Sequence, residues 1–138
     1  MAETAGTKLT LEVVTPEKVV ISEEVDEVVL PGIEGEFGVL PGHIPFLTAL
    51  KVGAMYYKKG EESEYLALSW GYVEVASDRV MVLAETAEKA TEIDIKRAED
   101  SREAAEKILT AGKEDTEYEK AQVRLEKSII RVQIAGKK

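Results

Sequence analysis

The sequence predicts an α+β protein in which an N-terminal antiparallel β-sandwich is followed by a C-terminal antiparallel two-helix hairpin. Two observations support this fold class. Up to residue 90, short apolar runs alternate with turn residues, and from residue 91 the apolar spacing becomes that of a helix. The chain has 138 residues, of which 44% are hydrophobic, enough for one ordinary domain with an appendage. We therefore divide it into a sandwich domain, 1–88, and a helical hairpin, 89–138.

The first part of the chain has the pattern of short strands. In residues 8–15, Leu9, Leu11 and Val13 occupy one face and polar residues the other. Turn signals rich in Pro, Gly, Ser and Asp separate the later β-branched and aromatic runs. Helical patterns do not intervene, which argues against a doubly wound sheet. We expect strands over residues 8–15, 19–22, 27–30, 54–58, 65–70, 72–76 and 79–85.

Residues 31–46 stand out because they hold three of the four prolines and four of the ten glycines. Such a composition is typical of a stiff, shaped surface loop. The glycine spacing matches neither a dinucleotide-binding fingerprint nor a phosphate loop. A stiff loop loses little entropy on docking, so its apolar and charged side chains indicate a protein contact.

Residues 91–111 contain neither Gly nor Pro and predict the first helix, with Thr91 as N-cap and Asp94 completing an approximate capping box. Gly112 would end this helix, and Asp115 or Thr116 would start the second. The facing residues are mostly small, so the hairpin buries little apolar surface. We expect it to be marginally stable alone and to act as a movable arm.

Charge is distributed unevenly along the chain. The net charge of −9 falls within residues 1–90, whereas residues 91–138 carry 11 acidic and 11 basic side chains. An acidic domain is repelled by phosphate backbones, so nucleic-acid binding is disfavoured. Residues 122–138 are nevertheless basic, with a balance of +4. This basic tip suits an acidic partner, a return onto the chain's own body, or a solvated helix end that complements the helix dipole.

Several classes of protein are excluded or disfavoured by composition. The absence of cysteine excludes disulfide scaffolds, thiolate metal sites and a cysteine nucleophile, and the single histidine argues against a multi-histidine metal site. Neither a bilayer-spanning apolar run nor a signal peptide is visible, so we expect a protein without a transmembrane segment. Carboxylates at Glu34, Glu36 and 61–64 lie in expected turns without polar partners, which argues against an enzyme.

A family resemblance adds to these expectations. The string GEFGVLPGHIPFLTAL at 35–50 resembles the signature loop of the epsilon subunits of F-type ATP synthases. Shorter similarities follow in the family's order, with VVTP at 13–16, SWGYVEV at 69–75, VLAETA at 82–87 and IDIKRA at 93–98. The resemblance covers nearly the whole chain, from about Lys8 to Val132.

The resemblance implies a non-catalytic rotor subunit peripheral to the cytoplasmic face of a bacterial inner membrane. The sandwich would hold the gamma subunit and rest on the c-ring, with Glu36 and His43 facing the ring. The hairpin would be a regulatory arm that inhibits ATP hydrolysis when it extends toward the alpha and beta subunits. Its basic residues Arg124, Lys127 and Arg131 would meet acidic surfaces there.

The resemblance also bears on nucleotide binding. No cofactor is required, but some members bind regulatory ATP, and in this chain Asp94, Arg97 and Arg131 match residues of that site. The match is partial: Lys127 stands where those members have an arginine, and Ala104 stands where they have another. A free-standing nucleotide-binding sandwich is the alternative function, and titration with Mg-ATP distinguishes it from the rotor subunit.

Overall fold

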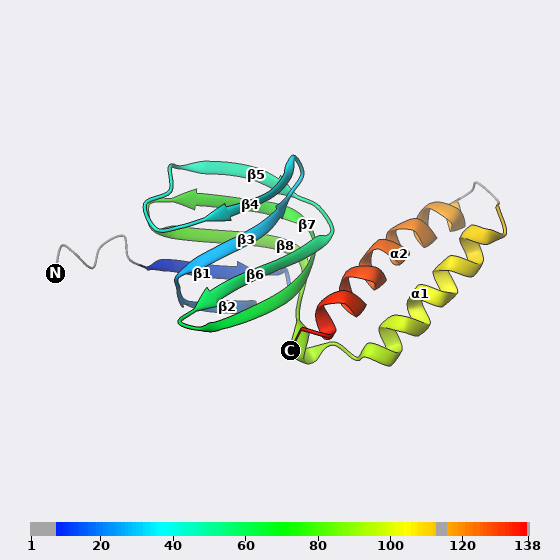
Figure 1. Ribbon diagram of the computed structural model, residues 1–138. Coiled ribbons are helices and arrows are strands. Elements are labelled where there is room, and N and C mark those ends of the chain that lie inside the picture. The colour runs from blue at the N-terminus through cyan, green and yellow to red at the C-terminus, as the bar shows by residue number, and fades with distance from the viewer. Residues whose placement is uncertain (1–7, 113–115, 138) are drawn as a thin grey trace.

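The computed structural model describes residues 8–112 and 116–137 and contains a β-sandwich joined to two packed helices (Figure 1). The strands are β1 (Leu9–Val14), β2 (Val19–Val25), β3 (Glu27–Gly32), β4 (Gly35–Val39), β5 (Phe46–Leu50), β6 (Gly53–Lys59), β7 (Glu62–Ala76) and β8 (Arg79–Lys89). A short 3₁₀ turn, η2 (Ala90–Glu92), leads into α1 (Ile95–Thr110) and α2 (Thr116–Ala135). The predicted sandwich followed by a helical hairpin is confirmed.

The eight strands form one sheet that folds back on itself. Their order is β2-β1-β8-β7-β5-β3-β4, and β6 bridges β3 and β7, which joins the two layers. Neighbouring strands are antiparallel with one exception, since β1 and β8 run parallel. These two strands are the first and last of the sandwich, so no hairpin connection dictates their relative direction.

The core lies between the two layers, and the alternation seen in the sequence fills it. Leu9, Leu11 and Val13 of β1 are all fully buried, as the period-two pattern predicts. Large side chains from the other strands complete the core, among them Leu30, Met55, Leu66 and Leu68. Tyr57 is buried at its edge, and burial together with the hydrogen bond to Glu23 raises its pKa above that of a free tyrosine.

Residues 31–46 contain more regular structure than a loop. The segment includes β4 and the start of β5, and β4 pairs along its length with β3. Two of the five residues of β4 are glycines, which interrupt the hydrophobic alternation by which a strand is recognised. The prediction of a loop throughout was therefore wrong, although the turn at residues 40–45 between β4 and β5 is irregular.

The two strands expected at 65–70 and 72–76 are one strand of 15 residues, β7. Trp70 (φ 35°) and Gly71 (φ 154°) bend it without ending it. A Cβ at Gly71 would lie 1.9 Å from the carbonyl oxygen of Leu83, so only glycine fits there. Gly71 marks a close approach between β7 and β8, whereas the sequence alone suggests that it separates two strands.

The first helix begins later than expected. Thr91 lies in η2, and Asp94 is the N-cap of α1, accepting a hydrogen bond from the backbone N–H of Arg97 at 3.1 Å. Buried Ile93 is extended and separates the two helical segments, so Thr91 is not the cap. α1 ends at Thr110, and Gly112 follows its C-cap residue Ala111 with φ 73°, as is usual for a glycine after a helix. Of the two proposed starts, Thr116 begins α2, and Asp115 lies outside the described residues.

The hairpin projects from one end of the sandwich and touches it mainly through α2 (Figure 1). Ala105, Ala121 and Ser128 are buried between or along the helices. Ala98, Ile134 and Ala135 form a small cluster with Ala67 of β7 at the base. Within the described residues, no helix combines the length and hydropathy needed to cross a membrane.

Candidate functional site

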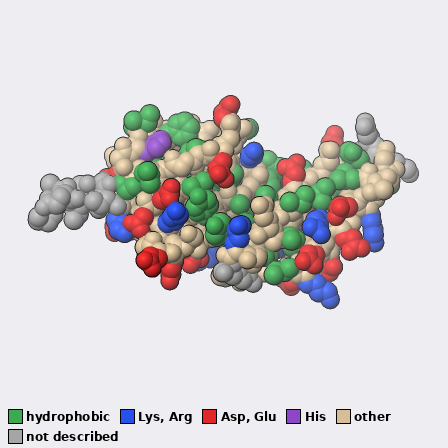
Figure 2. Space-filling model, in the orientation of Figure 1, with side chains coloured by type: hydrophobic (Ala, Val, Ile, Leu, Met, Phe, Trp, Pro, Cys, Tyr) green, Lys and Arg blue, Asp and Glu red, His purple; other side chains and the backbone are tan. Residues whose placement is uncertain are grey.

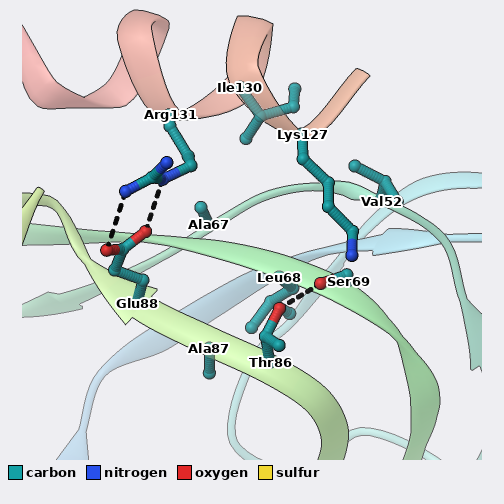
Figure 3. Close-up of a pocket in the computed structure, with 10 residues that line it drawn as sticks. All are labelled: Val52, Ala67, Leu68, Ser69, Thr86, Ala87, Glu88, Lys127, Ile130 and Arg131. Atoms are coloured by element: carbon teal, nitrogen blue, oxygen red, sulfur yellow. Dashed lines mark hydrogen bonds and ion pairs between the residues drawn. The ribbon is translucent and has the colours of Figure 1, made fainter. Parts of the chain in front are cut away.

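The junction between the arm and the sandwich contains a cavity of about 360 Å³ (Figure 3). Strands β7 and β8 form its floor and α2 its roof, and Figure 3 shows the two basic side chains descending from the helix toward the strands. Most of the wall is apolar, and Ser69, Thr86 and the charged side chains of Glu88, Lys127 and Arg131 supply its polar groups. The residues around it are Val52, Ala67, Leu68, Ser69, Thr86, Ala87, Glu88, Lys127, Ile130 and Arg131.

Arg131 and Glu88 form the main polar contact across this junction. Arg131 Nε donates to Glu88 Oε1 at 2.7 Å, and Nη2 donates to Oε2 at 3.2 Å. The pair is bidentate, the geometry in which a guanidinium and a carboxylate interact best. The side chains are only 25% and 34% exposed, so solvent screens this pair less than an ordinary surface ion pair.

Two lysines of the C-terminal segment lie over aromatic rings of β7. Lys127 Nζ is 4.9 Å from the ring centroid of Trp70, and Lys137 Nζ is 5.5 Å from that of Tyr65. Both distances fall within the range of a cation–π contact. Trp70 reaches this position from a left-handed backbone conformation that non-glycine residues rarely adopt.

The third basic residue proposed for the regulatory arm makes its contact within the hairpin. Arg124 Nε donates to Ser101 Oγ of α1 at 2.8 Å. Arg124, Lys127 and Arg131 thus all have partners on the chain itself. In this structure Lys127 and Arg131 lie against the sandwich, and Arg124 lies against α1.

The residues proposed for nucleotide binding are only partly brought together. Arg131 borders the cavity, whereas Asp94 and Arg97 are exposed at the start of α1 and are not among the residues that surround it. Asp94 caps the helix. Arg102 pairs with Glu106 on the surface of α1 at 3.5 Å, and Ala104 beside it is half-buried.

Two residues of this junction were not identified from the sequence. Glu88 is one acidic residue among many, and nothing local indicates that it faces an arginine 43 residues away. Trp70 was noted only as part of an expected strand. Its position directly before Gly71 and its status as the single tryptophan are the only sequence signals that it has.

The second pair of candidate residues is Glu36 and His43. His43 lies at the end of the sandwich away from the helices (Figure 2), whereas Glu36 pairs with Pro31 beside the β3–β4 turn. Glu36 is exposed on β4, and His43 is half-buried in the turn before β5. Phe46 stacks edge-on against both the His43 ring and the Phe37 ring, at centroid distances of 6.2 and 5.2 Å. These aromatic contacts link the turn to β4 and β5.

The His43 ring has a defined orientation. Its Nδ1 lies 2.7 Å from the carbonyl oxygen of Ile44. Because a carbonyl only accepts, Nδ1 carries the proton, and in the neutral ring Nε2 is left as an acceptor. The ring thus presents one defined polar group.

Exposed apolar side chains lie in the β3–β4 turn, in the β4–β5 turn and on β5. Ile44 is 73% and Leu47 is 68% exposed, and Ile33 and Leu40 are also largely exposed. Figure 2 shows hydrophobic side chains gathered around the histidine at this end of the molecule. Such a patch on a small protein indicates a contact with another protein. In the part of the chain that is described, no group of three or more His, Cys, Asp or Glu side chains is arranged to hold a metal ion.

Comparison with known proteins identifies the class to which this fold and these surfaces belong. Residues 8–90 match the family described as "ATP synthase, Delta/Epsilon chain, beta-sandwich domain", and residues 91–136 match "ATP synthase, Delta/Epsilon chain, long alpha-helix domain". The chain belongs to the ATP synthase delta/epsilon family.

Individual relatives make the assignment more specific. The chain is 53% identical to the ATP synthase epsilon chain of Geotalea daltonii and 54% identical to that of Geobacter sp. strain M21, in each case over 94% of this chain and 95% of the relative. A chain in a structure of the Euglena gracilis mitochondrial ATP synthase has the same fold, with a TM-score of 0.80, 21% identity, and coverage of 96% of this chain and 82% of that one. The protein is thus an epsilon-type subunit, a non-catalytic component of the central stalk of F-type ATP synthase.

Proposed function

We propose that the sandwich couples the gamma subunit to the c-ring and that the helical hairpin is a movable brake on ATP hydrolysis. The observation that carries this proposal is the way in which the hairpin is held. A bidentate ion pair, two cation–π contacts and a small alanine-rich cluster connect it to the sandwich. Contacts of this kind break at a cost of a few kcal/mol, so a competing docking site can displace the arm.

The surface around Glu36 and His43 is the proposed contact with the c-ring. A carboxylate and an imidazole with a free acceptor nitrogen suit the polar and basic loops of a partner at the membrane surface. The exposed Ile44 and Leu47 add apolar area to the same contact. The proton-translocating complex would place the subunit peripherally at the cytoplasmic face of a bacterial inner membrane.

The released arm would present its basic residues to the alpha and beta subunits. Arg124, Lys127 and Arg131 are engaged inside this chain when the arm is docked. Detachment frees Lys127 and Arg131 from β7 and β8, and both then need new partners. Acidic surfaces on the catalytic subunits would supply these partners and hold the extended arm in its inhibitory position.

Removal of residues 91–138 tests this brake. The truncated subunit keeps every strand of the sandwich and should still assemble, so ATP synthesis should remain coupled while ATP hydrolysis by the complex rises several-fold. Both activities are measured on membrane vesicles that contain the reconstituted complex. Unchanged hydrolysis, with assembly shown to be complete, would reject the brake and leave only the coupling role.

A second candidate role is regulation by ATP bound at the arm junction. The cavity supports this role, because Arg131 and Lys127 border it and can pair with phosphate oxygens. Phosphate would have to displace Glu88 from Arg131, whereas Asp94 and Arg97 would have to reach the nucleotide from the start of α1.

Titration calorimetry of the full chain with Mg-ATP tests this role. Saturable binding that is lost in Arg131→Ala, but kept in the exposed-pair variant Arg102→Ala, supports it. If the wild-type chain shows no heat of binding at millimolar nucleotide, the arm is not regulated by ATP in this protein.

A further inference from the structure

The turn that carries His43 is fastened to a distant part of the chain. The backbone N–H of Gly42 donates to the Asp78 carboxylate, with 2.8 Å between Gly42 N and Asp78 Oδ1. The two residues are 36 positions apart, and Asp78 lies in the turn between β7 and β8. An exposed turn would otherwise give this N–H to water, so the carboxylate acts as a specific anchor.

The β7–β8 turn that contains Asp78 is itself bonded to β1. The backbone N–H of Thr10 donates to the Asp78 carbonyl oxygen at 2.8 Å, which ties the β7–β8 turn to the first strand. The next residue, Arg79, pairs with Glu12 of β1 across the parallel strands. The Asp78 backbone is therefore held by the sheet, so its carboxylate extends from a fixed point toward the turn that it contacts.

The anchored turn sets the place of the His43 ring. Gly42 has φ 85°, a left-handed conformation that glycine adopts more easily than other residues. The chain turns back at this point, and the His43 N–H donates to the Leu40 carbonyl oxygen at 3.1 Å. From there the ring reaches the Ile44 carbonyl and the edge of Phe46. Asp78 holds the residue immediately before His43, so it restricts the position of the histidine without touching it.

We propose that Asp78 is a positioning residue for the ring contact: its carboxylate holds the Leu40–His43 turn so that His43 meets the c-ring in one orientation. This inference rests on the proposed function of the His43 surface. Loss of the anchor would leave the fold intact but would spread the turn over several conformations, and ordering it again would weaken the contact.

The first part of the test uses the full isolated chain. In Asp78→Ala, amide hydrogen exchange at Gly42 should become about fivefold faster or more, as expected for the loss of a charge-assisted hydrogen bond. Asp78→Asn keeps an acceptor oxygen and should restore much of the protection. Asp100→Ala, which removes an exposed carboxylate of α1, should leave Gly42 unchanged. Equal exchange in wild type and Asp78→Ala overturns the proposal.

The second part uses the assembled complex and compares ATP-driven proton pumping with ATP hydrolysis. We expect His43→Ala and Asp78→Ala to lower the pumping obtained per ATP hydrolysed, and Asp78→Asn to recover it, which a merely structural role would not predict. If His43→Ala lowers the ratio and Asp78→Ala does not, the positioning role is wrong although the ring contact stands. If neither variant lowers it, the proposed contact of this surface fails, and the role of Asp78 fails with it.

Discussion

The sandwich and the arm are stabilised in different ways. The sandwich encloses large side chains such as Leu11, Leu30 and Leu66, each fully buried, and each contributes about 1.5–3 kcal/mol on burial. The helices bury mainly alanines, and the arm meets the sandwich through one ion pair, two ring contacts and a small cluster. A body held by a core keeps one shape, whereas an appendage held by polar contacts can exchange them for others. This contrast matches the proposed division between coupling and regulation.

The largest effect should come from the core of the sandwich. Leu11→Ala removes a fully buried side chain and should lower the free energy of unfolding by about 2–5 kcal/mol. Leu47→Ala removes a side chain of the same size that is 68% exposed, and should change it by less than about 0.5 kcal/mol. Urea denaturation followed by circular dichroism measures both. Similar losses in the two variants would contradict the assignment of the core.

The next effect should come from the ion pair at the junction. Arg131→Ala should weaken docking of the arm by about 1–2 kcal/mol, because a bidentate but partly exposed pair is lost. The core of the sandwich should be unaffected, so the midpoint of its unfolding should move little. Trp70 is the only tryptophan and lies beneath α2, so its fluorescence reports arm release.

A matched control and a double-mutant cycle distinguish the loss of the Arg131–Glu88 ion pair from general effects of charge. Arg102→Ala removes an arginine whose partner is on the same helix, and should leave Trp70 fluorescence as in wild type. The double variant Arg131→Ala/Glu88→Gln should weaken docking of the arm by less than the sum of the two single variants, since both substitutions remove the same interaction. Strict additivity would show that the pair does not hold the arm.

A smaller effect is expected at the cation–π contact. Lys127→Ala should weaken docking by about 0.5–1 kcal/mol and shift the emission of Trp70. Lys127→Arg keeps a cation that stacks well on an indole ring and should retain docking. Limited proteolysis of the arm gives a second readout. If Lys127→Ala leaves both the emission and the cleavage rate unchanged, the contact contributes nothing to docking.

The smallest effect concerns acid stability of the sandwich. The hydrogen bond from Lys8, followed by that from the Gly60 N–H, lowers the pKa of Asp26 below its ordinary value. Because the folded state holds the charged form more strongly, Asp26 stabilises the fold above a pH of about 4 and this contribution is lost as the pH falls through the lowered pKa. Asp26→Asn should therefore flatten the acid limb of a stability–pH curve. An unchanged limb would show that Asp26 has no linkage to folding.

Much of the fold could be predicted from the sequence because local patterns report it. The alternation around Leu11 predicted β1, and Gly112 predicted the end of the first helix. The patterns failed where glycine lies within a strand. Two glycines interrupt the alternation of β4, and Gly71 is required in β7 because the Leu83 carbonyl approaches it closely. The same limit applies to Glu88, whose partner Arg131 is distant in the sequence.

The sequence alone determined the class of this protein, since hydrophobic periodicity and the string at 35–50 depend only on the order of residues. It placed His43 and the basic residues of the arm on a stiff loop and a helix. Only the tertiary structure decided what these residues face: Arg131 meets Glu88, Lys127 lies on Trp70, and Gly42 is held by Asp78. The physical reason is that contacts between distant segments depend on how the layers and helices pack, and that packing leaves no signal in any local window.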